Sequence, residues 1–180
     1  AKLVSHNFNV LKQSNCEFFV GDGIQYLKTL DKLDCIFIDP ARRKDSQRVF
    51  RLEDCEPNVI DLKNLFFEKA NHILIKTAPL LDIRQTLSDL EGVKEIHVIA
   101  VNNDCKEVLY LLEKDFTGEA QIFCINLKKE SKEEFRFTLS EERETIAPYS
   151  EPLEYIYEAN AAIMKAGAFK AIACQHKLYK

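Results

Sequence analysis

The sequence predicts an α/β fold in which parallel strands and helices alternate, end in an antiparallel hairpin and are followed by a small α+β module. Two observations carry this prediction. Short apolar runs alternate with segments whose apolar residues recur at helical spacing, which is typical of βα units and a parallel sheet. The apolar runs 93–101 and 106–113 are separated by Asn102-Asn103-Asp104, a turn-forming sequence that indicates a hairpin.

The first expected elements lie before residue 40. Residues 1–14 carry apolar side chains at helical spacing and are expected to form a helix. Residues 17–20 are a short apolar run, expected as a strand, and Gly21-Asp22-Gly23 ends it and opens a helix over 24–30. Residues 34–39 lack polar alternation, which predicts a strand buried on both faces. Pro40 cannot donate to a sheet ladder, so this strand should stop at Asp39.

The middle of the chain is expected to continue the same alternation. Residues 41–56 are polar, arginine-rich and too long for a tight turn, which indicates a functional loop. Pro57 can occupy the first turn of a helix that runs to about residue 71. A strand over 73–77 and a helix over 80–90 follow, and the two hairpin strands then complete the sheet.

The sequence pattern changes near residue 116, and we place a boundary between domains 1–115 and 116–180 there. Strands are expected over 120–127 and 135–139, then an acidic helix over 140–144 and a short strand over 155–157. Asn160 is a suitable N-cap for a helix over 161–173. These elements make up the small α+β module.

Composition restricts the class of protein. The net charge of −4 excludes a uniformly basic nucleic-acid binder, so any such contact must come from a local patch. No apolar run approaches the roughly 20 residues that span a bilayer, and no signal peptide opens the chain. Six cysteines without a CxxC and four histidines without ligand spacing favour a reduced, cytoplasmic protein without a metal site. Because the chain lacks an initiator methionine, we expect it to be part of a longer protein.

Asp39 is the leading candidate for a functional residue. It follows a predicted buried strand, and open α/β sheets bind their ligands at the carboxyl ends of their strands. A carboxylate there can accept a hydrogen bond from an amino group or ring N–H and orient the substrate for reaction. Lys76 ends the next strand and would face the same crevice. The alternatives are a turn-forming Asp-Pro and a strand-end lysine that extends into solvent.

A basic loop follows Asp39-Pro40 directly. It contains Arg42, Arg43, Lys44, Arg48 and Arg51. Arginines of this kind can bind a phosphate backbone in a bidentate manner, which predicts a nucleic-acid contact beside the crevice. The alternative is a solvated loop whose arginines pair with nearby acidic residues such as Glu53.

The first domain resembles the later half of a class I S-adenosylmethionine-dependent methyltransferase. The resemblance lies in Phe18-Phe-Val-Gly21-Asp22, in Asp39-Pro40-Ala41-Arg42 and in the final hairpin. It implies a partial Rossmann-like sheet, catalytic roles for Asp39 and Pro40, and S-adenosylmethionine binding by Gly21, Asp22 and Gly23. From the basic loop and the strand end themselves, we predict that the substrate is bound by Arg42, Arg43, Lys44, Arg48 and Lys76.

The whole chain resembles a bacterial group that joins such a methyltransferase to a C-terminal THUMP-like domain. Matching segments are 38–43, 103–107 and 157–169, although Ala159 stands where the group usually has proline. The glycine-rich cofactor loop and the ribose-binding acid of the family are not found in the chain. We therefore expect these 180 residues alone to bind S-adenosylmethionine poorly.

Two functional interpretations remain open from the sequence. The first is a methyltransferase that acts on RNA or another nucleic acid and is represented here by a part of its chain. The second is a non-catalytic α/β scaffold or RNA-binding module that has lost methyl transfer. A glycine-rich βα turn upstream, followed by a strand-end acid, would favour the enzyme.

Overall fold

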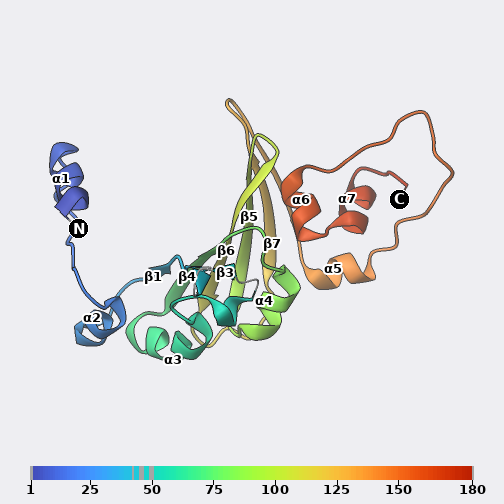
Figure 1. The fold of residues 1–180 in the computed structure, drawn as a ribbon. Coiled ribbons are helices and arrows are strands. Elements are labelled where there is room, and N and C mark those ends of the chain that lie inside the picture. Colours follow the sequence, from blue (N-terminus) through green and yellow to red (C-terminus); the bar gives the residue numbers. More distant parts are fainter. Residues whose placement is uncertain (1, 42, 45–46, 49–50, 180) are drawn as a thin grey trace.

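The structure, a computed structural model, describes residues 2–41, 43–44, 47–48 and 51–179. One six-stranded sheet dominates it, with the strand order β1-β4-β6-β5-β7-β8 (Figure 1). The strands of this sheet are β1 (Ile36–Ile38), β4 (His72–Thr77), β5 (Val93–Val101), β6 (Asp104–Glu113), β7 (Gln121–Leu127) and β8 (Lys132–Phe137). The helices are α1 (Lys2–Val10), α2 (Gly23–Thr29), α3 (Val59–Lys69), α4 (Ile83–Asp89), α5 (Leu139–Glu144), α6 (Ala161–Ala166) and α7 (Phe169–Gln175).

The sheet confirms the α/β prediction and the hairpin. Strands β1 and β4 pair in parallel, with Ile38 opposite Ile75. Strands β5 and β6 form the expected antiparallel hairpin, and β6 lies between β5 and β4. Strand β7 adds in parallel to the far side of β5, and β8 returns antiparallel along β7. The sheet therefore continues past residue 116, and the division into domains 1–115 and 116–180 stays a prediction.

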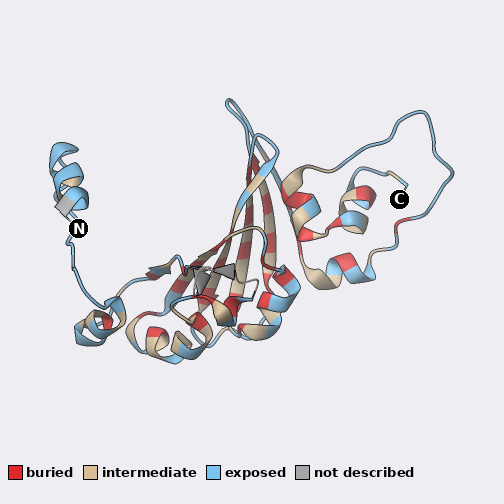
Figure 2. Ribbon diagram, viewed as in Figure 1, coloured by how far each residue is buried: buried red, intermediate tan, exposed pale blue. Residues whose placement is uncertain are grey.

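Helices cover one face of the sheet. Buried side chains of α3, α4 and α6, such as Phe66, Ile83 and Ile163, share one core with alternate strand residues such as Ile75 and Ile96. Alternate burial along β4, β5, β6 and β7 follows because successive strand residues point to opposite faces. Figure 2 shows this alternation of buried and partly exposed positions along the strands.

The prediction that strand 34–39 is buried on both faces is wrong. Strand β1 spans only Ile36–Ile38, with Ile36 buried and Phe37 59% exposed. In the described chain β1 is an edge strand that pairs only with β4, and packed helices lie on one face. Phe37 points to the other face and therefore stays in solvent.

The strand expected over 17–20 is also absent from the described structure, because no neighbouring strand pairs with these residues. Phe18 packs edge-on against Phe8 of α1, and Phe19 stacks on Tyr26 of α2. Helix α1 lies away from the sheet in Figure 1 and ends at Val10, earlier than the predicted residue 14. Lys12 adopts the left-handed backbone conformation (φ 53°), which ends the helix.

The remaining differences from the prediction are local. The helix expected over 161–173 is two helices, α6 and α7, because Gly167 has φ 76° and forms a left-handed C-cap. Residues 155–157 form no strand, and Tyr155 and Tyr157 are exposed.

The predicted loop 41–56 contains the short strands β2 (Arg43–Lys44) and β3 (Gln47–Arg48) and a 3₁₀ turn, η1 (Leu52–Asp54). Backbone hydrogen bonds between Ala41 and Glu56 close this loop. None of the described helices is long and apolar enough to cross a membrane.

Candidate functional site

A polar crevice lies at the carboxyl ends of β1 and β4. Because the two strands run parallel with Ile38 opposite Ile75, the next residues along each strand, Asp39 and Lys76, reach the same edge of the sheet. The start of β6 completes the site from the other side of β4. The crevice has a volume of about 400 Å³ and is lined by Asp39, Pro40, Ala41, Lys76, Thr77, Ala78, Lys106 and Glu107.

Asp39 and Lys76 form an ion pair in this crevice. The distance from Lys76 Nζ to Asp39 Oδ2 is 2.6 Å, and the side chains are 32% and 53% exposed, respectively. The hydrogen bond to Asp39 raises the pKa of Lys76. Burial opposes this rise, and the negative charges of Asp39 and Glu107 add to it. Lys76 therefore faces the same crevice as Asp39, as expected from its position at the strand end. The catalytic role of Asp39 and the substrate-binding role of Lys76 stay predictions.

The crevice also includes two residues that the site prediction missed. Lys106 and Glu107 lie near the start of β6 and line the crevice. Both begin the predicted hairpin strand 106–113, but neither is among the predicted site residues. Antiparallel pairing of β6 with β4 brings Val108 opposite Thr77 and so places Glu107 at this edge. A hairpin strand inserted between β5 and β4 was not predicted, so the site prediction did not include its start.

The residues proposed for cofactor binding lie elsewhere. Asp22 is the N-cap of α2, where its Oδ1 accepts hydrogen bonds from the backbone N–H groups of Ile24 (2.8 Å) and Gln25 (3.1 Å). Gly21 precedes this cap and Gly23 begins the helix. The residues that line the crevice do not include these three. Asp22 is exposed, so its carboxylate is open to solvent while it caps the helix.

The basic loop is only partly described. Arg42 lies outside the described residues, as do the side chains of Arg43, Lys44 and Arg48. The backbone places Arg43 and Lys44 in β2 and Arg48 in β3, shortly after Ala41, which lines the crevice. Arg51 pairs with Glu53 at 2.5 Å on the surface, as the solvated-loop alternative predicts for this residue. Phosphate binding by the other basic residues stays a prediction.

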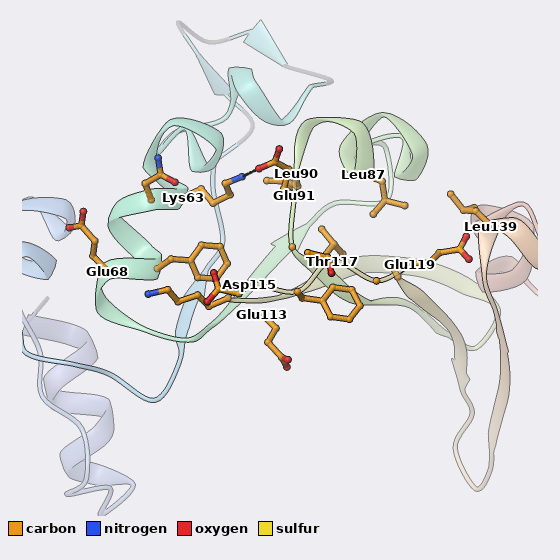
Figure 3. Close-up of a pocket in the computed structure, with 18 residues that line it drawn as sticks. Lys63, Glu68, Leu87, Leu90, Glu91, Glu113, Asp115, Thr117, Glu119 and Leu139 are labelled. Carbon is orange, nitrogen blue, oxygen red and sulfur yellow. Dashed lines mark hydrogen bonds and ion pairs between the residues drawn. The ribbon is translucent and has the colours of Figure 1, made fainter.

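A larger hollow lies at the opposite end of the sheet, between α3, α4 and the link from β6 to β7. Its volume is about 1020 Å³ (Figure 3). Lys63 and Glu91 pair at 2.8 Å on its rim, and Lys94, outside the hollow, pairs with Glu113 at 2.7 Å. Most of its lining belongs to α3, to the turn before β5 and to the link from β6 to β7, and β5 contributes only its first residue, Val93. The hollow therefore lies at the amino end of β5, whereas α/β sheets bind ligands at the carboxyl ends of parallel strands. The smaller crevice is therefore the candidate site.

The described residues offer no alternative chemistry based on metals. Among them, no group of three or more His, Cys, Asp or Glu side chains is placed to hold a metal ion. Burial raises the pKa of the Cys124 thiol to about 12 and raises that of Cys105, which is the opposite of what activates a cysteine nucleophile. The Asp39–Lys76 pair remains the principal polar feature of the candidate site.

The chain is similar to one protein of known structure and, in part, to one domain family. Over 96% of its length, the chain is similar to the crystal structure of a "putative methyltransferase" from Porphyromonas gingivalis W83, with 34% sequence identity and a TM-score of 0.86. The chain spans 44% of the length of that protein. Residues 155–180 match the model of a ferredoxin-like domain family. The comparison with curated proteins gives no match.

These comparisons support the methyltransferase resemblance in its general form. The chain is similar in fold and sequence to a protein described as a "putative methyltransferase". The match over 155–180 is to a ferredoxin-like domain, so the THUMP-like character of residues 116–180 gains no support and stays a prediction.

Proposed function

We propose that this chain is part of an S-adenosylmethionine-dependent methyltransferase that acts on RNA or another nucleic acid. One observation carries the proposal. A carboxylate paired with a lysine lies at the carboxyl edge of two parallel strands, in a chain similar over nearly its whole length to a protein described as a putative methyltransferase. In this proposal β1, β4, β5 and β6 belong to a partial Rossmann-like sheet.

The proposal assigns a positioning role to Asp39. Its carboxylate accepts a hydrogen bond from a substrate N–H group and directs the lone pair of the reacting atom toward the methyl donor. Pro40 follows at once and is buried, which fixes the backbone that carries Asp39. In-line methyl transfer needs little acid–base catalysis, so correct geometry supplies most of the rate.

The exposed carboxylate of Asp22 fits a cofactor contact. It stands between Gly21 and Gly23 and can accept a hydrogen bond from an adenine amino group while Oδ1 caps α2. When bound, S-adenosylmethionine supplies a methyl group activated by its sulfonium sulfur. The chain's contribution is to hold the adenine end through Asp22 and to orient the substrate through Asp39.

The basic hairpin gives the nucleic-acid part of the proposal. Strands β2 and β3 carry Arg43, Lys44 and Arg48 on the segment that follows Ala41 of the crevice. Basic side chains beside a substrate crevice suit a polyanion whose backbone passes the site while one unit enters it. A non-catalytic RNA-binding module is the second candidate, and the same hairpin favours it.

Methyl transfer by the full-length protein tests the proposal. We expect transfer of labelled methyl groups from S-adenosylmethionine to RNA, and an Asp39→Ala variant should lose at least about 100-fold in rate because the substrate is misplaced. Its cofactor affinity, measured by calorimetry, should stay near that of the wild type. Asp34→Ala is the matched control, because Asp34 is exposed and lies before β1 rather than after it.

Three results would count against parts of the proposal. Activity of Asp39→Ala within a few-fold of wild type would mean that Asp39 has only a structural role as a turn residue. Loss of cofactor binding in Asp39→Ala would place Asp39 on the cofactor side of the crevice. RNA binding without methyl transfer by the wild-type protein would favour the non-catalytic module.

A further inference from the structure

We propose that Lys76 and Asp39 together read one edge of a nucleobase, with Lys76 donating to an acceptor atom and Asp39 accepting from the adjacent N–H group. This inference deepens the proposed function and rests on it. It makes Lys76 the specificity-determining residue of the crevice and a base nitrogen the atom that is methylated. The nitrogen would gain the methyl group as the methyl–sulfur bond of the donor breaks, and would give up its N–H proton to solvent.

The charges of the crevice do not favour a phosphate. Its lining contains two carboxylates, Asp39 and Glu107, and two lysines, Lys76 and Lys106. Lys76 is paired with Asp39, and Lys106 is paired with Asp104 just outside the crevice. A phosphate site needs cations that are not already neutralised. The crevice therefore suits a neutral polar group, and phosphate contacts are left to the hairpin that follows Ala41.

The pair presents a donor beside an acceptor. A lysine ammonium offers three donors and no acceptor, whereas an ionised carboxylate only accepts. One N–H of Lys76 bonds to Asp39 Oδ2, which leaves two further donors. The hydrogen bond to Asp39 and the nearby Glu107 raise the pKa of Lys76, so its ammonium stays charged at neutral pH. Both side chains are partly exposed, so a ligand can reach them.

A nucleobase edge matches this arrangement. Bases carry N–H or amino donors next to ring-nitrogen or carbonyl acceptors, and unstacked RNA bases are read through these edges. A phosphate offers acceptors alone. The crevice volume of about 400 Å³ lies within the range of roughly 300–1,000 Å³ that small-ligand sites occupy.

The same lining argues against methylation of a base carbon. Covalent attack on a pyrimidine ring requires a nucleophile such as a cysteine thiolate. The residues that line the crevice include no cysteine, and the nearby Cys105 has a raised pKa. Carbon methylation through a covalent intermediate therefore lacks its nucleophile at this site.

A binding experiment tests the inference without relying on catalysis. Fluorescence anisotropy would compare a single-stranded RNA 15-mer with an abasic 15-mer of the same ribose–phosphate backbone, using the full-length protein. We expect the wild type to prefer the RNA, and Lys76→Met to lose about 10- to 100-fold of that preference, the value of a hydrogen bond to a charged group. Lys76→Arg should keep part of it. Lys114→Met, with the same change of charge at the exposed Lys114, is the control.

The methylated product gives the second readout. Nucleoside mass spectrometry should find the methyl group on a base nitrogen, and Lys76→Met should raise KM for RNA more than it lowers kcat. Equal binding of both 15-mers by the wild type, or a methyl group on ribose or carbon, would overturn the inference.

The two proposals fail separately. Methyl transfer to RNA that is unaffected by Lys76→Met would refute the reading role and leave the proposed function standing, with the ion pair as a surface contact only. A base preference that depends on Lys76, without any methyl transfer, would refute the enzyme and keep the base-reading site.

Discussion

The side chain of Asn103 accepts a 2.7 Å hydrogen bond from the backbone N–H of Ala161, which joins the β5–β6 turn to the start of α6. The backbone N–H of Asn103 in turn donates to Asn126 Oδ1 in β7 at 2.9 Å. Asn126 and Asn160 both donate to Glu133 of β8, at 2.8 and 3.3 Å. This asparagine network fixes the turn, the β7–β8 hairpin and α6 together. Two segments that carry the family resemblance, 103–107 and 157–169, therefore meet in space.

We predict that Asn103→Gly lowers the free energy of unfolding by about 1–2 kcal/mol, because it removes the side-chain acceptor at the N-terminus of α6. Asn103 has φ 63°, a conformation that glycine tolerates, so the change isolates the hydrogen bond from backbone strain. Asn103→Asp keeps an acceptor oxygen and should stay close to wild type. Urea unfolding followed by circular dichroism measures both. An equal loss of free energy of unfolding in the two variants would mean that the hydrogen bond from Ala161 to Asn103 contributes nothing to stability.

The asparagine network could not have been predicted from sequence, although its members were visible. Asn160 was expected as a helix N-cap and does cap α6 through Ala162 and Ile163. The Asn102-Asn103 turn was expected from composition, since asparagine adopts positive φ readily, and both residues do so. Nothing in local sequence indicates that Asn103 and Ala161 meet, because long-range contacts depend on how β7 adds to β5. Local turn and cap chemistry was predictable, and tertiary pairing was not.

In the candidate site, too, local sequence patterns predicted some residues, whereas others depend on tertiary strand pairing. The parallel order of β1 and β4 follows from the βα pattern, which is why Asp39 and Lys76 were expected at one edge. Strand β6 between β5 and β4 follows from no local pattern, so Lys106 and Glu107 were missed. The apolar run 17–20 forms no strand, because a strand requires a partner that its own sequence does not specify.

We predict that Glu142→Ala destabilises the contact between α5 and α7 by about 1–3 kcal/mol, because it removes a charged acceptor from partly buried backbone N–H groups. The Glu142 side chain is buried, and its carboxylate accepts hydrogen bonds from the backbone N–H groups of Lys170 (3.0 Å) and Ala171 (2.8 Å) at the start of α7. Thermal unfolding measures the change. Glu144→Ala is the control, since Glu144 is exposed and pairs only with Arg143 among described residues. Equal melting temperatures for the two variants would contradict the prediction.

We predict that Tyr110→Phe changes the free energy of unfolding appreciably only at high pH. Tyr110 is fully buried in β6, and burial raises its pKa to about 12, from about 10 in the unfolded chain. As pH rises from about 10 to about 12, the unfolded chain loses this proton while the folded protein keeps it, so wild-type stability falls by up to about 3 kcal/mol. The phenylalanine variant lacks this loss and should unfold at higher urea than wild type at pH 11.

At pH 7 the two proteins should differ by less than about 1 kcal/mol. The Tyr110 hydroxyl makes no hydrogen bond of good geometry within the described residues, and the neighbouring Thr77 and Thr86 hydroxyls donate to backbone carbonyls instead. Tyr157→Phe is the control, because Tyr157 is exposed and its hydroxyl changes surroundings little on folding. The same alkaline loss in Tyr110→Phe and wild type would show that another group causes it.

The last prediction concerns the basic residues after Pro40. If Arg42, Arg43 and Arg48 contact phosphates, replacing all three by alanine removes counterion release at three positions. The slope of log affinity against log salt should then become shallower by about 2 for single-stranded RNA, at roughly 0.7 per contact. Sequence preference should not change, because phosphate contacts do not distinguish bases.

Fluorescence anisotropy of the full-length protein with single-stranded RNA, from low to moderate salt, measures this slope. The matched control replaces Lys28, Lys114 and Lys129, which are exposed and do not line the crevice, and removes the same charge from the protein. A shallower slope only in the arginine variant assigns the contact to the basic residues between 42 and 48. Equal slopes in both variants would mean that RNA binding depends only on the net charge of the protein. The arginines would then be solvated surface residues, like the exposed Arg51–Glu53 pair.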